Sequence, residues 1–188
     1  MTRSFLVLFN DLPIERDSVK KGENGPEVVT AARCVNVGLF LSNSLRRDVD
    51  VHLGILEHSQ LGIISFPGEN LKRVSPDERS ISFFLLKAIE VLNGMKEDDV
   101  KSMDNGICIQ RMALDRFISR WKGDRVFVSI KQDYLDLEDS NGTDGLYIYQ
   151  IGQEMHPDLL KYSQVGRPRT PERFILDINL RSDLHISL

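Results

Sequence analysis

Hydrophobic residues in the first half of the chain follow two spacings, and each spacing predicts a different kind of element. A short apolar run over residues 3–9 predicts a buried strand. From Val28 onward, apolar residues recur every three or four positions, which predicts an amphipathic helix of about 17 residues ending near Asn43-Ser44. Alternating apolar residues over 48–56 predict a second strand, and residues 61–66 are expected to pair with it as a hairpin.

The second half continues this alternation of helices and strands. A helix is predicted from Ser75 to Gly94, because Ser75 can cap its first turn, Glu78 completes a capping box and Gly94 fits its end. A shorter helix is predicted near 114–121. Further strands are predicted over 107–112, 126–130 and 146–151. The residues after Gly152 are mostly polar and include Arg167, Arg169, Arg173 and Arg181.

Strands that alternate with helices predict an α/β fold in one domain of 188 residues, with a largely parallel sheet and helices on both faces. Parallel sheets bind ligands beyond the carboxyl ends of their strands. The segments that follow Ile130, Ile151 and Ile175 are therefore the first places to look for a site.

Composition and charge argue against several classes of protein. The chain is 41% hydrophobic and 28% charged with a net charge of −4, which is unlike a disordered chain or a protein coated in positive charge. No apolar run approaches the roughly 18 residues that span a bilayer, and no secretory leader is evident, so a cytoplasmic location without membrane contact is expected. Cys34 and Cys108 are far apart and the four histidines are scattered, so neither a disulfide nor a metal site is expected.

Basic residues gather in two segments despite the acidic net charge. One group surrounds a predicted helix and the other lies in the C-terminal part: Arg111, Arg116, Arg120, Lys122 and Arg125 in the first, Lys161, Arg167, Arg169 and Arg173 in the second. Such groups bind phosphate or simply form a solvated surface, and the sequence leaves both interpretations open.

Two short stretches could carry chemistry. Arg33 and Asn36 are three positions apart on a predicted helix, so both can project from one face. Asp77 and Arg79 lie at the start of the next helix, where they could face a ligand as carboxylate and guanidinium. Each pair also has a plain structural interpretation: a solvated arginine beside a buried amide for the first, and a well-capped helix start for the second.

These stretches resemble a known family in their order and spacing. Three segments carry the resemblance: Arg33-Cys34-Val35-Asn36-Val37-Gly38-Leu39-Phe40-Leu41-Ser42, Arg46-Arg47-Asp48-Val49-Asp50-Val51-His52-Leu53, and Pro76-Asp77-Glu78-Arg79-Ser80. In these segments the chain is similar to the archaeal tRNA pseudouridine N1-methyltransferases (TrmY). The similarity continues more weakly through the predicted strand at 126–130 and through residues 147–152.

The resemblance implies the SPOUT class of methyltransferases. Its members have a parallel-sheet α/β fold with a C-terminal trefoil knot, which would span about 126–188 here, and they form homodimers that bind S-adenosylmethionine in the knot. The implied reaction is methyl transfer to N1 of a pseudouridine in the tRNA T-loop, at position fifty-four, without a metal. The alternatives are a relative that binds RNA without transferring methyl, and an enzyme of this fold that acts on rRNA pseudouridine.

The resemblance also assigns roles to residues. Asp77 would accept the N1 proton or orient the base, and Arg79 would stabilise developing negative charge, so both are candidate catalytic residues. The candidate RNA-binding residues are Arg33, Asn36, Arg46 and Arg47. The candidate cofactor-binding residues are Ile130, Gly152, Ile175, Leu176, Asp177, Ile178, Asn179, Leu180 and His185.

One cofactor loop departs from the family. The family has Ser-Leu-Gly-Pro in its third cofactor loop, and the matching residues here, 175–180, contain neither glycine nor proline. The chain also stops where the family would still have most of a closing helix. The expectation is therefore a glycine-poor loop over 175–180 with no closing helix behind it.

Overall fold

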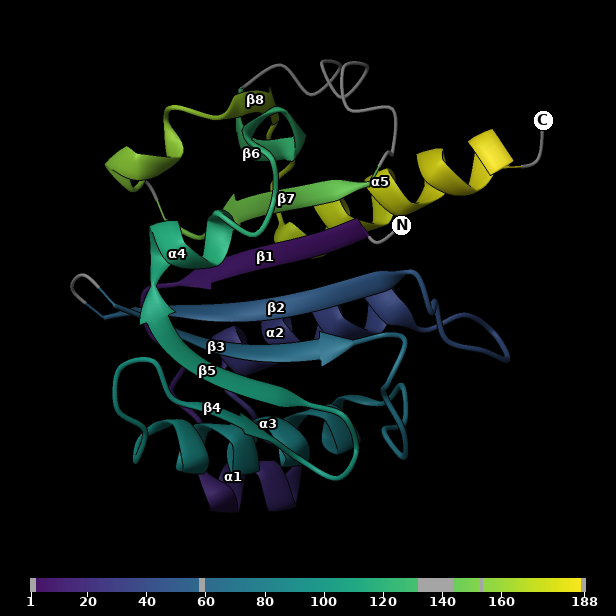
Figure 1. Ribbon diagram of the computed structural model, residues 1–188. Coiled ribbons are helices and arrows are strands. Elements are labelled where there is room, and N and C mark those ends of the chain that lie inside the picture. The colour runs from purple at the N-terminus through teal and green to yellow at the C-terminus, as the bar shows by residue number, and fades with distance from the viewer. Residues whose placement is uncertain (1–2, 58–59, 132–143, 153, 187–188) are drawn as a thin grey trace.

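An eight-stranded sheet forms the centre of the molecule (Figure 1). The computed structural model describes residues 3–57, 60–131, 144–152 and 154–186. The strands are β1 (Arg3–Phe9), β2 (Val49–Glu57), β3 (Gln60–Pro67), β4 (Val100–Ser102), β5 (Cys108–Ala113), β6 (Val126–Lys131), β7 (Gly145–Gln150) and β8 (Ser163–Gly166). The helices are α1 (Arg16–Lys21), α2 (Pro26–Leu39), α3 (Glu78–Leu92), α4 (Leu114–Ile118) and α5 (Pro171–Ile186), with single 3₁₀ turns η1 (Gly123–Arg125) and η3 (Pro157–Leu159).

The sheet has a parallel part and an antiparallel part, in the order β4-β5-β3-β2-β1-β7-β6-β8. β1 pairs in parallel with β2 and β7, and β6 pairs in parallel with β7 and β8. β3, β5 and β4 extend the other end by antiparallel pairing. The predicted α/β fold with a largely parallel sheet is confirmed. The trefoil knot stays a prediction, because residues 132–143 between β6 and β7 lie outside the described residues.

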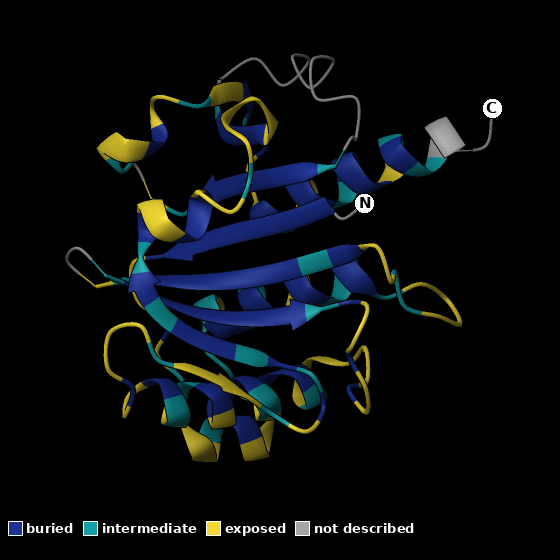
Figure 2. Ribbon diagram, viewed as in Figure 1, coloured by how far each residue is buried: buried dark blue, intermediate teal, exposed yellow. Residues whose placement is uncertain are grey.

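Both faces of the sheet are covered. This explains why residues 5–9 are all apolar and do not alternate with polar residues. Phe5, Val7 and Phe9 pack in one core with α2, α3 and α5, whereas Leu6 and Leu8 pack in a second core with α4 and η3. Strands buried on both faces read as continuous hydrophobic runs. Figure 2 shows the consequence: the central strands are buried, and exposed residues lie on the outer helices and loops.

Two helix boundaries differ from the predictions. α2 ends at Leu39 rather than near Asn43-Ser44, because Phe40 has extended backbone angles and forms a β-bridge with Leu45. α3 is capped by Asp77 rather than Ser75: Asp77 Oδ1 accepts a hydrogen bond of 2.8 Å from the Ser80 amide. A carboxylate at this position satisfies a free amide and also complements the helix dipole.

The C-terminal region departs furthest from the predictions. The chain does have a closing helix, α5, and residues 175–180 lie within it rather than in a loop. The physical reason is an apolar stripe, because Phe174, Ile175 and Ile178 fall on one face and are buried against the body of the protein. None of the described helices combines the length and the hydrophobicity needed to cross a bilayer.

Candidate functional site

The carboxyl ends of β1, β7, β6 and β8 meet at one edge of the sheet, which is the expected place for a ligand in a parallel α/β fold. Two described segments form this edge: residues 151–152 after β7, and residues 167–170 between β8 and α5. The segment after β6 lies outside the described residues. We call the two described segments the carboxyl edge.

Gly152, a predicted cofactor contact, has a backbone conformation that favours glycine. Its φ of +106° lies in the region that side chains other than glycine rarely adopt. A Cβ atom there would also lie 3.3 Å from Asn10 Nδ2, which follows β1 at the same edge. A larger residue at this position would therefore strain the backbone and narrow the edge. Ile130, the other predicted contact at a strand end, lies in β6 and is half-buried.

Arg167 fixes the geometry of the carboxyl edge. Its guanidinium donates hydrogen bonds to the carbonyls of Ser129 (3.0 Å), Gln150 (2.8 Å) and Gly152 (3.3 Å), so one side chain joins β6, β7 and the segment after β7. The sequence identified Arg167 only as one of several basic residues. Its contacts depend on three strand ends that are brought together by the fold.

Tyr149 completes this arrangement from inside β7. The Arg167 guanidinium carbon lies 4.4 Å from the centre of the Tyr149 ring, and the Tyr149 hydroxyl donates a 2.9 Å hydrogen bond to the Pro168 carbonyl. Burial raises the pKa of Tyr149, and the nearby Arg167 charge opposes part of that rise. The hydroxyl therefore stays protonated at neutral pH and holds the loop before α5 against β7.

The end of β8 and the loop after it contain a glycine and a proline, the two residue types that are absent from 175–180. Gly166 ends β8 and Pro168 follows two residues later, so a glycine and a proline lie directly before the closing helix. The sequence analysis predicted a loop over 175–180, and this was wrong because those residues lie in α5. The signal that could have corrected it is the pair Gly166 and Pro168 followed by the apolar stripe of α5.

Residues of the predicted third loop instead attach α5 to α2. Asn179 is fully buried, and its Nδ2 donates to the carbonyls of Gly38 (3.1 Å) and Val37 (3.4 Å) at the end of α2. Asp177 accepts a 3.0 Å hydrogen bond from Arg173 Nε one turn earlier, and burial raises its pKa. Of the remaining predicted contacts, Leu176 is half-buried and Leu180 is exposed, while the side chain of His185 lies outside the described residues.

The candidate RNA and catalytic residues meet where α2 contacts the start of α3. Asn36 Nδ2 donates to the carbonyl of Pro76, directly before the Asp77 cap. Arg33 lies one turn earlier on α2 and is exposed, as are Asp77 and Arg79. The structure thus brings these four residues into one neighbourhood, and the Asn36 amide bonds to backbone there.

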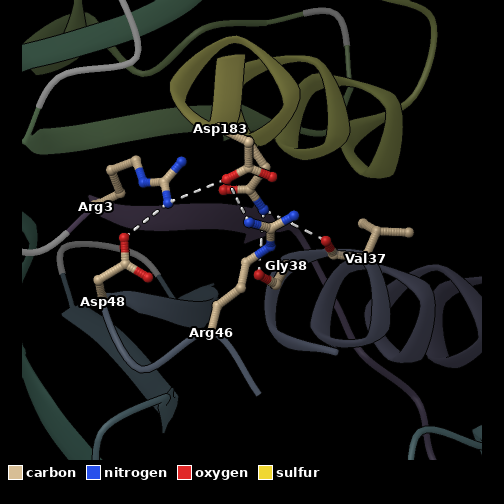
Figure 3. Close-up of polar contacts among 7 residues, drawn as sticks. Arg3, Val37, Gly38, Arg46, Asp48 and Asp183 are labelled. Carbon is tan, nitrogen blue, oxygen red and sulfur yellow. Dashed lines mark hydrogen bonds and ion pairs between the residues drawn. The ribbon is translucent and has the colours of Figure 1, made fainter. Parts of the chain in front are cut away.

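Arg46 and Arg47 make contacts within the protein. Arg46 Nη1 lies 2.7 Å from Asp183 Oδ1 of α5, and its side chain is only 10% exposed. Figure 3 shows that Asp183 also faces Arg3, at 4.0 Å, while Arg3 bonds Asp48 at 2.8 Å. We call Arg3, Arg46, Asp48 and Asp183 the terminal ion cluster, because it joins the first strand to the last helix.

Arg47 binds a neighbouring loop. Its Nη1 donates to the carbonyls of Gly68 (2.8 Å), Leu71 (3.2 Å) and Glu69 (3.3 Å). These three hydrogen bonds hold the segment between β3 and α3 near the start of β2. Unlike Arg33 and Arg79, Arg46 and Arg47 are therefore engaged by the fold itself.

The candidate catalytic residues and the carboxyl edge lie in different parts of the chain. β3 ends at Pro67, which pairs with Asp50 near the start of β2, so the path to Asp77 leaves from the amino ends of the parallel strands. Gly152 follows the carboxyl end of β7. Figure 1 also shows α3 beside the β3–β5 end of the sheet and β8 at the opposite end. Among the described residues, Asp77 and the carboxyl edge therefore lie apart.

The chemistry available in the described residues is that of polar side chains and backbone groups. No group of three or more His, Cys, Asp or Glu side chains in this part of the chain could hold a metal ion. Burial raises the pKa of Cys34 well above its usual range, so this thiol stays neutral and serves as a small core residue. What the carboxyl edge offers instead is fixed backbone carbonyls, a glycine and an aromatic ring.

Comparison with known proteins links this arrangement to methyltransferases. Residues 2–157 match the model of the family described as "Putative SAM-dependent RNA methyltransferase". The tRNA (pseudouridine(54)-N(1))-methyltransferase of Haloferax volcanii is 30% identical over 139 residues, which are 70% of this chain and 66% of that protein. The protein of the same name from Methanococcoides burtonii is 33% identical over 125 residues, which are 65% of this chain and 60% of that protein.

A solved structure shares the fold. The crystal structure of Archaeoglobus fulgidus Nep1 bound to S-adenosylhomocysteine aligns over all of both chains with a TM-score of 0.61 and 13% sequence identity. At that identity the likeness concerns the fold alone. The matched segment spans less than two thirds of the length of the curated relatives.

Proposed function

The chain belongs to the SAM-dependent RNA methyltransferase family that residues 2–157 match, and on this premise we propose that it methylates N1 of a pseudouridine in the T-loop of tRNA. The observation that carries the proposal is the match itself, which joins the α2–α3 neighbourhood and Gly152 in one family pattern. The names of the Haloferax and Methanococcoides relatives support position 54 as the target. A tRNA substrate also places the proposed reaction in the cytoplasm.

We propose that S-adenosylmethionine binds at the carboxyl edge. The residues there fit such a ligand: Gly152 leaves room that a Cβ atom would restrict, and Arg167 holds the strand ends in place. Ile130, Gly152 and the loop 167–170 would hold the cofactor, which supplies a methyl group on an already activated sulfonium. In this proposal residues 175–180 support the edge from α5, because their buried members pack on α2.

The residues that bind the RNA must remove the proton from N1 of pseudouridine and orient this nitrogen toward the methyl group. N1 of pseudouridine is a weak N–H acid, so a carboxylate within reach of it would favour the nucleophilic form. Asp77 is exposed and its second carboxylate oxygen is left over from capping, which suits that role. Arg79 and Arg33 nearby would stabilise negative charge on the base or bind a phosphate.

A homodimer would reconcile these two positions. Because Asp77 lies away from the carboxyl edge of its own protomer, we propose that it acts with the carboxyl edge of a second copy. The proposal is tested with two inactive variants. Asp77→Asn keeps a helix cap and removes the base, and Gly152→Val blocks the cofactor site. Mixing the two variants should restore methyl transfer, since one site of the mixed dimer keeps both residues. Mixtures that stay inactive, despite exchange of subunits, would contradict a shared site.

The activity itself is tested with defined RNAs. The protein is incubated with S-adenosylmethionine and a tRNA that carries pseudouridine at the T-loop target, and the nucleosides are analysed by mass spectrometry. N1-methylpseudouridine should appear, and the matched tRNA with uridine at that position should stay unmodified. Transfer only to a pseudouridine-containing rRNA hairpin would move the substrate to rRNA. Tight tRNA binding with no cofactor binding by calorimetry would indicate a non-catalytic relative.

A further inference from the structure

A groove runs between α1 and α3, on the outer side of the helical layer and away from the carboxyl edge. It consists of two adjoining cavities of about 410 Å³ and about 130 Å³, both lined by Val19, Lys20 and Phe83. The larger one reaches Asp77 and Arg79, and the smaller one reaches Lys87. The groove therefore begins at the candidate catalytic pair and follows α3.

Phe83 gives this groove an accessible aromatic surface. Its side chain is 44% exposed, although large apolar rings are normally buried. The ring is held in place by an edge contact with Phe84, at 5.4 Å between centroids, and Lys87 Nζ lies 4.4 Å from its centroid. An exposed ring that is fixed by its neighbours is a suitable platform for a flat ligand.

Cations and the ring alternate along the groove. Arg79, Phe83 and Lys87 are spaced four residues apart, so they form one ridge on α3 about 12 Å long at 1.5 Å per residue. Lys20 of α1 faces the same cavities. An aromatic ring between fixed positive charges is the arrangement by which proteins bind single-stranded nucleic acid: bases stack and phosphates pair.

The charge of the groove differs in sign from that of the whole chain. Arg16, Lys20, Arg79 and Lys87 line the two cavities against only Asp77 and Glu90, whereas the net charge of the chain is −4. Glu90 pairs with Arg16 at 2.6 Å, which leaves Lys20, Arg79 and Lys87 against Asp77. The net positive charge that remains favours a polyanion over a neutral or acidic protein surface.

From these observations we propose that the α1–α3 groove binds an unpaired nucleotide of the RNA substrate, with its base stacked on Phe83 and adjacent phosphates on Lys20 and Lys87. The inference rests on the proposed function for the identity of the RNA. It adds a recognition site for a single-stranded segment next to the target base, which favours a loop over a duplex.

The test compares two substitutions of the ring. Phe83→Tyr keeps the aromatic face, whereas Phe83→Leu removes it and keeps apolar bulk. Fluorescence anisotropy without cofactor should show about tenfold weaker binding of tRNA and of a single-stranded RNA oligonucleotide for Phe83→Leu, and near-normal binding for Phe83→Tyr. Binding of a blunt RNA duplex should change little. Leu160→Ala, at another exposed apolar side chain, controls for loss of surface hydrophobicity.

Two further measurements separate the possible outcomes. Ultraviolet crosslinking of a 4-thiouridine-labelled tRNA should label the peptide that contains Phe83, and Lys20→Ser with Lys87→Ser should flatten the dependence of affinity on salt. Unchanged RNA affinity in Phe83→Leu would overturn the proposal. If the same variant instead changed the oligomeric state in light scattering, the groove would be a protein interface. Because these assays contain no cofactor, an absence of methyl transfer would leave their outcome unaffected.

Discussion

The two ends of the sheet are held together by different forces. At the β3–β5 end, α3 covers the sheet through buried apolar side chains such as Leu85 and Leu92. At the β6–β8 end, apolar side chains such as Val128 are also buried, but Arg167 adds hydrogen bonds that connect the strand ends. Apolar packing tolerates exposed charged residues on its outer surface. Hydrogen bonds instead fix the orientation of the groups that they join. This suits the carboxyl edge, which must present backbone atoms to a ligand.

The largest effect is expected at a side chain that is held by apolar packing alone. Leu85 is fully buried in α3, so Leu85→Ala should lower the free energy of unfolding by about 2–5 kcal/mol through lost burial and a cavity. Urea denaturation measures this change. Because no charge is involved, the loss should be the same in low and high salt. A salt-dependent loss would show that electrostatics also holds this end.

Substitution of Arg167 tests the polar end. Arg167→Met leaves three strand-end carbonyls without their donor, and we expect unfolding to become easier by about 2–3 kcal/mol. Calorimetry should also show weaker binding of S-adenosylmethionine, since the carboxyl edge loses its brace. Arg167→Lys is the matched control: it keeps the charge and lacks the planar fork, so it should recover only part of both losses. Full recovery of stability and cofactor affinity in Arg167→Lys would mean that the positive charge matters and the planar geometry of the guanidinium does not.

Between the two ends, His52 makes stability depend on pH. It is buried in β2 beside Phe117, and burial lowers its pKa from 6.5 to about 3. The unfolded chain therefore binds a proton that the folded chain rejects, and stability falls as the pH drops below 6.5 toward 3. From pH 7 to pH 5 the loss should be about 2 kcal/mol. Denaturation curves at several pH values measure it. His52→Phe should flatten this part of the profile, and an unchanged slope in that variant would assign the effect to other groups.

The smallest effect is expected at the terminal ion cluster. Asp183→Asn removes the partner of Arg46, but Asp183 is 40% exposed, so solvent screens the pair and the cost should be about 1 kcal/mol. Hydrogen exchange should show the change locally, as faster exchange in α5 with little change in α3. Leu180→Ala, an exposed position on the same helix, serves as the control. Equal acceleration in α3 would mean that the two ends unfold together.

The sequence predicted elements well where apolar residues repeat and poorly where elements are short and exposed. β1, β2, β3 and α3 follow clear patterns, whereas all three residues of β4 are exposed and β8 has only four residues. α5 was missed although its apolar stripe is present, because the family pattern placed a loop over its first turns. α1 has a single buried residue, Val19, which is too little to form a pattern.

For the site, the sequence identified residue types but not their partners. Gly152 was predicted from a single position, and its left-handed conformation fits that assignment. The sequence does not distinguish the exposed Arg33 from the ion-paired Arg46, because both are arginines in or near the same helix. Only the position of α5 decides that Arg46 meets Asp183 and that Arg33 stays exposed. The membership of the family, in contrast, followed from local segments and is confirmed.

The place of β1 in the sheet has a consequence for synthesis on the ribosome. β1 is made first and can pair with β2 once residue 57 has emerged, but its other neighbour, β7, begins only at residue 145. During that interval one backbone edge of a strand with five consecutive apolar residues, 5–9, has no partner, a condition that invites pairing with other nascent chains. Its shielding by a chaperone, or a slow rate of translation before β7, would therefore influence the yield of native protein more than the stability of the finished fold.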